Sequence, residues 1–420
     1  MTRGTHGTGT RRTSRRTAGA RRAAAAGFAA LLLAGAGAAA APAALAAGAP
    51  GGDGRGRLLS VVPVAARDRA EVVRELADQH IGTAPVRHGV RAYRLTYRTV
   101  DPYGGPTTAT GLLTLPDGGG RRLALVSDTH GTMSDRAYAP SVAEAARAPS
   151  YLFAATGRAV AAPDYLGLGE GPGPHPYMDT RSAVTASVDM LRAARTAARG
   201  LGRTIDGDLY VSGFSQGGQV AMALGRAVQA GDAPGFRLKA LAPVSGPYDL
   251  LGTQVPAMTD GRVNDISAVF YLSYFLVAQN RLHAIYQDPS EVFRQPYADR
   301  VEHLFDGRHE DEDIVRQLAP NVKELVTADF YRGLGHPTGG FAEALRANDG
   351  ACAWKPGVPV RLYAGDGDTD VPIGNARACE RTLAARGARV RLLDLGAVDH
   401  QGSGRGALAG VARWFGAGAR

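Results

Sequence analysis

From residue 123 onward, short apolar runs alternate with segments that are long enough to form helices. The apolar runs are residues 123–126, 160–162, 209–211, 240–243, 360–363 and 390–393. Parallel strands that are buried on both faces have this pattern, because the connection between two of them crosses the sheet as a helix. The pattern predicts an α/β fold with a mostly parallel central sheet and helices on both of its faces.

The residues before this region have a different rhythm. Apolar and polar residues alternate in 92–98 and 108–115, with a proline- and glycine-rich turn at 102–106 between them, which predicts an antiparallel pair of strands. Asp68 and Glu71 have the spacing of a capping box, which predicts a helix that runs to about Gln79. We therefore expect the folded domain to span residues 67–420, preceded by a flexible linker at 47–66.

Between residue 248 and about residue 354 the strand and helix alternation lapses. Helical patches at 268–282 and 313–318 lie in this stretch of roughly a hundred residues. That length is too great for a plain connection, so it predicts an insertion with its own structure. Ligands bind at the carboxyl ends of the strands in folds of this type, and we expect a helical cap at about 250–355 to lie over them.

The N-terminal residues account for most of the net charge of +9. Seven arginines and no acidic residues precede Ala46, so without this segment the net charge falls to +2 and no basic patch for nucleic acid remains. An arginine-rich start, an apolar stretch and a small-residue site at 44–46 predict a signal peptide at 1–46. The sequence leaves open a retained membrane anchor and a twin-arginine export route. After signal removal we expect a secreted protein without stable membrane insertion.

The first motif that indicates catalytic chemistry is Gly213-Phe214-Ser215-Gln216-Gly217. It lies between an apolar run and a helix-like stretch. This is the pattern of a nucleophile elbow, in which flanking glycines allow a tight turn that exposes the serine hydroxyl. A serine needs a histidine to accept its proton and a carboxylate to orient that histidine. His400 is the one later histidine that follows the last predicted strand. It is therefore the candidate base.

The acid should follow the strand at 360–363, where Asp366, Asp368 and Asp370 are available. Asp368 begins an Asp-x-x-Val-Pro arrangement and is the preferred candidate, whereas the other two could be turn residues. A tetrahedral oxyanion needs two backbone donors, for which we predict the amides of Gln216 and Thr132, with Gly131 as the alternative to Thr132.

Several ordered motifs from about residue 90 to the end together resemble those of exported bacterial α/β-hydrolases of the secretory lipase and esterase type. These motifs are the elbow, His130-Gly131-Thr132, residues 162–169, His175-Pro176-Tyr177, Asp368-x-x-Val371-Pro372 and Asp399-His400. The resemblance implies an α/β-hydrolase fold, a small-molecule or lipid ester as substrate, and Ser215, Asp368 and His400 as the catalytic triad. The cap departs most from the pattern, which leaves substrate choice open.

Other residues carry weaker signals. Four aromatic residues of the predicted cap could line an acyl pocket or hold the core of the cap together: Phe270, Tyr271, Tyr274 and Phe275. The histidines and acids at 303–313 suit the first turn of a solvated helix better than a metal site. No phosphate-binding or dinucleotide motif is present, so no cofactor is implied.

Export also bears on the two cysteines, because a secreted chain can keep a disulfide, and we expect Cys352 and Cys379 to be joined.

Two other functions remain open from the sequence. One is a serine peptidase on the same scaffold. The other is a catalytically silent extracellular binding module.

Overall fold

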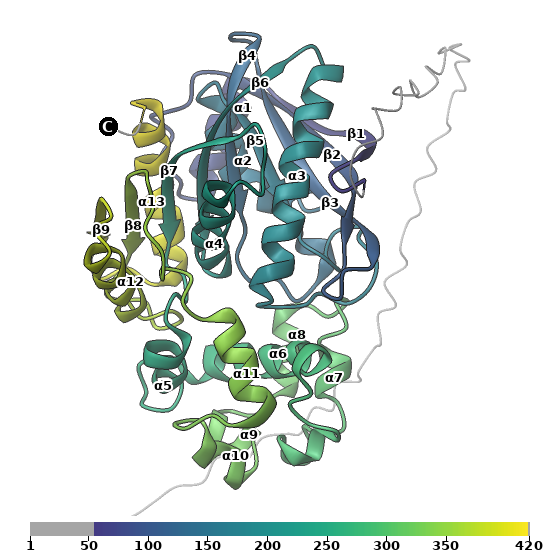
Figure 1. Cartoon of the computed structure of the whole chain (residues 1–420), viewed down its shortest axis with the longest axis vertical. Helices are drawn as coiled ribbons and strands as arrows, with labels where there is room; N and C mark the ends of the chain where they lie inside the picture. The colour runs from purple at the N-terminus through teal and green to yellow at the C-terminus, as the bar shows by residue number, and fades with distance from the viewer. Residues whose placement is uncertain (1–53, 419–420) are drawn as a thin grey trace, which may run out of the picture. The chain divides into compact units, whose positions relative to one another are not determined.

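The computed structural model describes residues 54–418 (Figure 1). A nine-stranded mixed sheet has the order β1-β2-β3-β5-β4-β6-β7-β8-β9. The strands are β1 Leu58–Arg67, β2 Gly89–Val100, β3 Pro106–Asp117, β4 Arg122–Thr129, β5 Ala159–Pro163, β6 Thr204–Phe214, β7 Arg237–Val244, β8 Val360–Ala364 and β9 Val390–Asp394. From β5 through β9 every neighbouring pair is parallel, whereas β1, β2, β3 and β5 pair in antiparallel fashion. The predicted fold class is confirmed.

Three helices cover each face of the sheet. One core cluster joins the strands to helices α3 Thr180–Gly200, α4 Gln216–Ala230 and α12 Gly374–Ala385. A second cluster on the opposite face joins them to α1 Arg69–Asp78, α2 Ala148–Ala155 and α13 His400–Gly416. Apolar side chains on both faces explain why the strands have short, continuously apolar sequences. Helix α1 begins with the expected capping box of Asp68 and Glu71.

The structure corrects part of the expected linker at 47–66. Residues Leu58–Arg67 form strand β1, which pairs with β2 along its length. This strand lies at the edge of the sheet and its side chains are half-buried or exposed, so its sequence lacks the continuous apolar pattern of the central strands. The predicted signal peptide at 1–46 lies outside the described residues.

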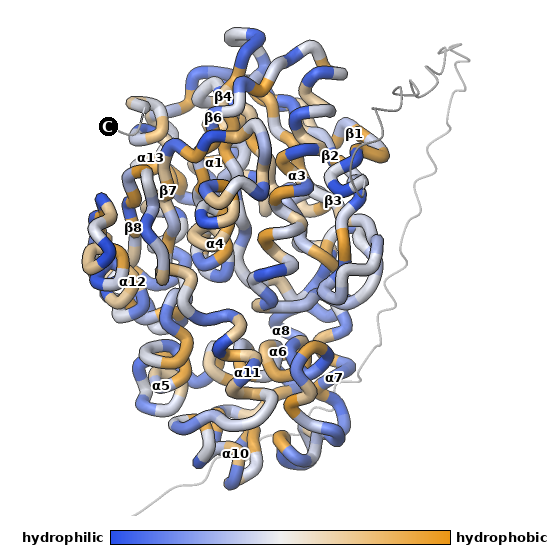
Figure 2. Tube along the Cα trace, viewed as in Figure 1, coloured by the Kyte–Doolittle hydropathy of each residue, from blue (hydrophilic) through white to orange (hydrophobic). Residues whose placement is uncertain are grey.

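The expected cap is present as a group of short helices between β7 and β8. Its helices are α5 Val255–Ala257, α6 Asp265–His283, α7 Val301–Leu304, α8 Asp311–Gln317, α9 Val322–Leu325, α10 Ala328–Gly333 and α11 Gly339–Asn348. They share a hydrophobic cluster that is separate from the two clusters of the sheet, and Figure 2 shows apolar stretches along the cap helices. The insertion therefore has a core of its own.

A disulfide joins Cys352, which follows α11, to Cys379 in α12, with Cα atoms 5.4 Å apart. The two cysteines lie on either side of β8 and the loop after it. None of the helices at residues 54–418 is long and apolar enough to cross a membrane.

Candidate active site

The elbow serine sits between the end of β6 and the start of α4. Ser215 has φ 56° and ψ −126°, a conformation that non-glycine residues rarely adopt, and its backbone N–H donates to Val244 O at 2.9 Å. A Cβ atom at Gly213 would lie 2.0 Å from Thr129 Oγ1, and one at Gly217 would lie 1.9 Å from Thr129 O. The close approach of β4 therefore requires glycine at both positions. Thr129 Oγ1 also contacts the Gly217 carbonyl at 2.7 Å and holds the turn.

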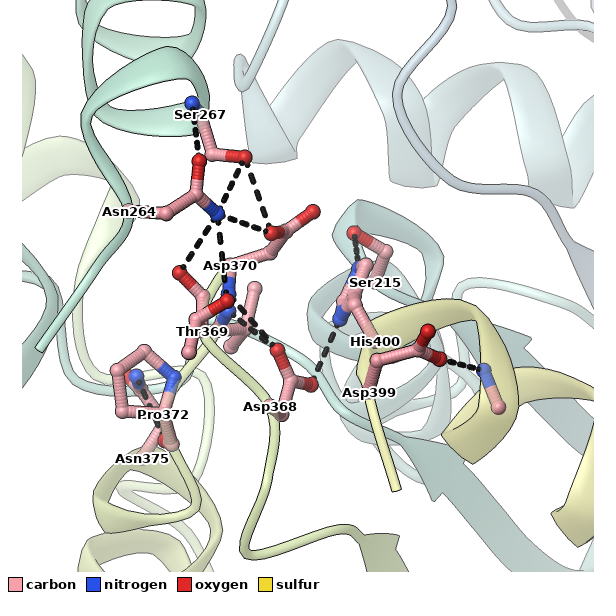
Figure 3. Close-up of polar contacts among 12 residues, drawn as sticks. Ser215, Asn264, Ser267, Asp368, Thr369, Asp370, Pro372, Asn375, Asp399 and His400 are labelled. Atoms are coloured by element: carbon pink, nitrogen blue, oxygen red, sulfur yellow. Dashed lines mark hydrogen bonds and ion pairs between the residues drawn. The ribbon is translucent and has the colours of Figure 1, made fainter. Parts of the chain in front are cut away.

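The structure brings Ser215, His400 and Asp368 into one hydrogen-bonded chain (Figure 3). His400 Nε2 lies 2.9 Å from Ser215 Oγ, and Nδ1 lies 2.7 Å from Asp368 Oδ2. All three residues are buried. His400 is the first residue of α13, where the Asp399 side chain caps the helix by accepting from Gly402 N–H. Asp399 is thus a helix cap, and Asp368 is the carboxylate that contacts the histidine.

The three aspartates of the loop after β8 have different surroundings. Asp368 Oδ1 accepts the backbone N–H groups of Asp370 and Val371 at 2.9 and 2.8 Å, so both of its oxygens are occupied. Asp366 is exposed. Asp370 points to the cap (Figure 3), where it accepts hydrogen bonds from side chains at the start of α6. These donors are Asn264 Nδ2 at 2.8 Å, Ser267 Oγ at 3.0 Å and Tyr271 OH at 3.1 Å.

The expected oxyanion donors flank the serine. Gln216 starts α4, and Thr132 lies in the loop after β4, where its hydroxyl is 2.9 Å from Tyr177 OH. Within residues 54–418 the backbone amides of Gly131, Thr132 and Gln216 form no hydrogen bond with another group. They are therefore free to donate to a substrate oxygen.

His130 braces this loop. Its ring nitrogens lie 2.7 Å from Gly131 O and 3.1 Å from Asp164 O, and its ring packs on Tyr165 with centroids 4.3 Å apart. Burial lowers the pKa of His130, which favours the neutral ring. Asp164 is itself buried, where it accepts from Thr110 Oγ1 at 2.6 Å and from Ser141 N–H at 3.1 Å. These residues shape the loop and do not contact Ser215 Oγ.

Two cavities meet at Ser215. The first, called here the cap cavity, measures about 50 Å³ and lies between the elbow and the cap. It is lined mainly by apolar side chains, among them Leu250, Met258, Phe275, Phe341 and Leu345. The second, called here the β4 cavity, measures about 300 Å³ and lies among the end of β4, α2 and α13. Ser215, Thr132 and Tyr271 line both cavities.

The four aromatic residues of α6 divide between the two roles left open by the sequence. Tyr271 and Phe275 line the cap cavity, whereas Phe270 and Tyr274 do not. The rings of Phe270 and Tyr274 instead pack on Phe305, at 5.6 and 4.7 Å between centroids, in the core of the cap.

The histidines at 303 and 309 both lie beside Asp306, and the acids at 311–313 form the first turn of α8. No cluster of potential metal ligands occurs in residues 54–418.

No family model and no curated protein matches the chain. The chain is similar to the crystal structure of the rice cell wall degrading esterase LipA from Xanthomonas oryzae, with 30% identity and a TM-score of 0.73 over 86% of this chain and 97% of that one. The chain belongs to the α/β-hydrolases.

Two further solved structures extend this comparison. A putative hydrolase from Legionella pneumophila is 25% identical to this chain. Its structure matches with a TM-score of 0.78 over 86% of this chain and 98% of the Legionella chain. Candida antarctica lipase A in its closed state shares the fold at 13% identity, with a TM-score of 0.63 over 87% of this chain and 83% of that one. The two neighbours at 25% identity or more are an esterase and a putative hydrolase, which supports hydrolytic activity.

The roles of two acidic residues beside the active site could not be predicted from the sequence. The sequence indicates Asp370 only as an alternative acid or a turn residue, because its contacts with α6 span about a hundred residues of sequence. Asp128, at the end of β4, lines the β4 cavity. Its position two residues before His130-Gly131-Thr132 was the only available signal.

Proposed function

We propose that the chain is a serine hydrolase that cleaves carboxylic esters through an acyl-enzyme. The observation that carries the proposal is the chain of hydrogen bonds from Ser215 Oγ to His400 Nε2, at 2.9 Å, and from His400 Nδ1 to Asp368 Oδ2, at 2.7 Å. Both distances lie within the range required for proton transfer and for orientation of the base. The esterase and lipase neighbours support the same reaction class.

In the proposed first half-reaction, His400 Nε2 takes the proton of Ser215 as Oγ attacks the ester carbonyl. The carbonyl oxygen becomes an oxyanion that accepts the Gln216 and Thr132 N–H groups. Asp368 holds the proton of His400 on Nδ1 and stabilises the imidazolium. The C–O bond then breaks, and His400 gives its proton to the departing alcohol.

In the second half-reaction, water replaces the alcohol. His400 takes a proton from the water as it attacks the acyl carbonyl. The Ser215 ester bond then breaks, His400 returns the proton to Ser215 Oγ, and the carboxylic acid leaves. The net reaction is hydrolysis of an ester to an acid and an alcohol. No metal or cofactor takes part in any of these steps.

A substrate panel tests the proposal. Purified protein is assayed with p-nitrophenyl esters of increasing acyl length and with peptide p-nitroanilides. We expect turnover of the esters only, and a loss of at least about 10⁴-fold in kcat for Ser215→Ala with an unchanged circular dichroism spectrum. Turnover of the anilides alone would identify a peptidase, and turnover of neither would favour a silent binding module.

We also propose that the protein is exported and that residues 1–46 are removed. The Cys352–Cys379 disulfide supports this, because disulfides persist in oxidising compartments outside the cytosol. N-terminal sequencing of protein recovered from the culture medium of an exporting bacterial host should begin at Ala47. A chain retained in the membrane fraction with its N-terminus intact would contradict the proposal.

A further inference from the structure

The loop after β4, which carries the proposed oxyanion donor Thr132, lacks main-chain support. Among residues 54–418, no main-chain group donates to or accepts from the main chain of residues 131–134. The free N–H groups suit the proposed reaction, but no main-chain hydrogen bond fixes the direction in which they point. An oxyanion hole is effective only when its donors are held in place before the reaction. Side chains must therefore hold this loop.

Hydroxyl groups of two tyrosines supply part of this support. Tyr274 of α6 donates to Met133 O at 3.1 Å, and Tyr177 OH lies 2.9 Å from Thr132 Oγ1. Within residues 54–418 the second contact is the only side-chain hydrogen bond of either Tyr177 OH or Thr132 Oγ1. Tyr177 is thus the residue that holds the side chain of the proposed donor itself.

The cap holds Tyr177 in position. Its ring stacks on that of Tyr274, with centroids 4.1 Å apart and planes inclined by 5°. Its main-chain carbonyl accepts from Gln279 Nε2 of α6 at 2.7 Å, and Gln279 is fully buried. Gln279 Oε1 accepts in turn from Asn348 Nδ2 of α11 at 3.3 Å. Contacts with the cap therefore fix both the ring and the main chain of this buried tyrosine.

The backbone beside Tyr177 is constrained as well. Met178 has φ 61°, in the left-handed region that residues with a side chain rarely adopt. Asp179 N–H donates to Pro176 O at 2.9 Å, and the Asp179 side chain caps α3 by accepting from Ser182 N–H. A backbone conformation of this kind persists only where the surrounding structure holds it, and such conformations cluster at functional sites.

We propose that Tyr177 is a positioning residue for ester hydrolysis, because its hydroxyl holds the Thr132 side chain so that Thr132 N–H points at the oxyanion. The role rests on the proposed function. Tyr177 and Thr132 line the cap cavity together with Ser215, so the hydrogen bond lies beside the nucleophile. Burial raises the pKa of Tyr177, and the hydroxyl therefore keeps its proton at neutral pH. Through Tyr177, helix α6 of the cap supports the oxyanion hole.

Loss of this hydroxyl should slow the reaction without weakening substrate binding. Removal of one oxyanion donor costs about 10²- to 10³-fold in kcat, and misplacement of a donor should cost at least about 10-fold. Both half-reactions pass through an oxyanion, so acylation and deacylation should slow alike. KM should then change little while kcat falls.

A double-mutant cycle with p-nitrophenyl butyrate tests the proposal. Tyr177→Phe removes the hydroxyl but keeps the stacked ring, and Thr132→Val removes the other partner with little change of shape. We expect each variant to lower kcat by about 10-fold or more with KM nearly unchanged. The double variant should lose no more than either single one, because both substitutions remove the same hydrogen bond. Thr132→Ser keeps a hydroxyl and should lose less than Thr132→Val.

The affinity for a tetrahedral adduct gives an independent readout. Ser215 Oγ bonds to the boron of butylboronic acid as His400 takes the serine proton, and a boronate oxygen then occupies the oxyanion position. The inhibition constant should rise in Tyr177→Phe by about the factor by which kcat falls, since transition-state analogues report the same interactions. A tyrosine that only stabilises the fold would leave the inhibition constant unchanged in folded protein.

Tyr286→Phe is the matched control. Tyr286 is a buried tyrosine of the cap core whose hydroxyl donates to Glu302 Oε1 at 3.0 Å, and its loss should leave kcat at the wild-type value. Melting temperatures show whether each variant is folded. Thr132 is only half-buried, so Thr132→Val tests the proposal even where Tyr177→Phe is unstable.

The other outcomes are decisive against the proposal. Wild-type kcat in folded Tyr177→Phe or in Thr132→Val would overturn it, and so would a double variant whose loss equals the product of the single losses. An equal loss in Tyr286→Phe, or an unchanged affinity of Tyr177→Phe for the boronic acid, would show that the effect does not pass through the oxyanion. Each of these results leaves the proposed function in place. Failure of the wild-type protein to hydrolyse any p-nitrophenyl ester would overturn the proposed function and this role of Tyr177 with it.

Discussion

At the scale of single residues, hydrogen-bond partners separate three aspartates that look alike in the sequence. One carboxylate oxygen of Asp368 contacts His400, and the other accepts hydrogen bonds from two backbone N–H groups. Asp366 is exposed, and Asp370 binds side chains of α6. The Asp-x-x-Val-Pro spacing pointed to Asp368. The contacts of Asp370 could not be predicted from the sequence, because they depend on how the cap packs against the loop after β8.

The first prediction concerns these three carboxylates. Asp368→Asn should lose most ester turnover, by roughly 10⁴-fold, because an amide stabilises the wrong histidine tautomer. Asp366→Asn is the matched control on an exposed neighbour and should keep its activity. Asp370→Asn should lose little, since its amide oxygen can still accept from Asn264 and Ser267. An inactive Asp370→Asn with an active Asp368→Asn would show that the acid is misassigned. The measurement is kcat with p-nitrophenyl butyrate.

The second prediction follows from the pKa of Asp128, which burial raises from 3.8 to about 6. Between these values the unfolded chain has lost the proton and the folded chain still holds it, so stability falls as pH rises from about 4 to about 6. Asp128→Asn removes this penalty. Its free energy of unfolding should exceed that of wild type above pH 6, by no more than about 3 kcal/mol, with the gain vanishing near pH 4.

Urea denaturation at pH 4, 5, 6 and 7.5 measures this difference. A gain that is the same at every pH would mean that Asp128 does not titrate as described. A loss at all pH values would mean that the hydrogen bond with Ser150 matters more than the charge.

At the scale of elements, most of the sheet could be predicted from the sequence, and the exceptions have physical reasons. The six apolar runs became β4 to β9. The central strands β4 to β8 are largely buried on both faces, which leaves a continuous apolar signal, whereas β9 is an edge strand whose residues are half-buried or exposed. Strand β1 was missed because it is an edge strand that carries Pro63 and half-exposed side chains. Asp128 followed a correctly predicted strand, but its contact with Ser150 of α2 depends on tertiary packing.

The third prediction concerns the disulfide, which links the segment after α11 to α12 and encloses β8 with the acid loop. The cysteines are 27 residues apart, and closing such a loop stabilises the folded state by about 3 to 4 kcal/mol in the chain-entropy account. Reduction should therefore lower the melting temperature by several degrees. Scanning calorimetry with and without reductant measures this.

Thiol titration of the denatured, unreduced protein provides the check on this linkage. Two reactive thiols per chain would show that the cysteines are not joined. Cys352→Ser with Cys379→Ser should reproduce the melting temperature of the reduced protein and should not respond to reductant.

At the scale of the whole domain, the cap and the sheet together enclose the cap cavity, in which we expect the acyl portion of the ester to bind. The loop after β8 contributes Asp368 to the proposed triad and, through Asp370, binds the start of α6 (Figure 3). The same helix contributes Tyr271 and Phe275 to the cap cavity. The position of the cap is therefore tied to the loop that carries the acid. The sequence located the cap but could not define its cavity, which depends on how short helices pack.

The fourth prediction follows from the size of the cap cavity, about 50 Å³ with mostly apolar walls. Because this space is small, kcat/KM should be highest for esters with short acyl chains and should fall as the chain lengthens. Phe275→Ala removes a ring from the cavity wall and should shift the optimum to longer chains. Phe305→Ala removes a ring from the cap core, away from the cavity, and should leave the optimum in place.

Melting temperatures of both variants separate this effect from unfolding, because both phenylalanines are buried and each truncation should cost about 3 to 5 kcal/mol. A shift of the acyl optimum in Phe305→Ala, or none in Phe275→Ala, would place the acyl group elsewhere.

The central claim is that Ser215 is an activated nucleophile, and covalent labelling measures this most directly. A fluorophosphonate forms a stable adduct only with a serine whose proton is taken by a neighbouring base. Intact mass spectrometry of the mature protein should show one adduct per chain, peptide mapping should place it on Ser215, and Ser215→Ala and His400→Ala should remain unlabelled. Labelling at another serine, or equal labelling of Ser215→Ala, would contradict the account.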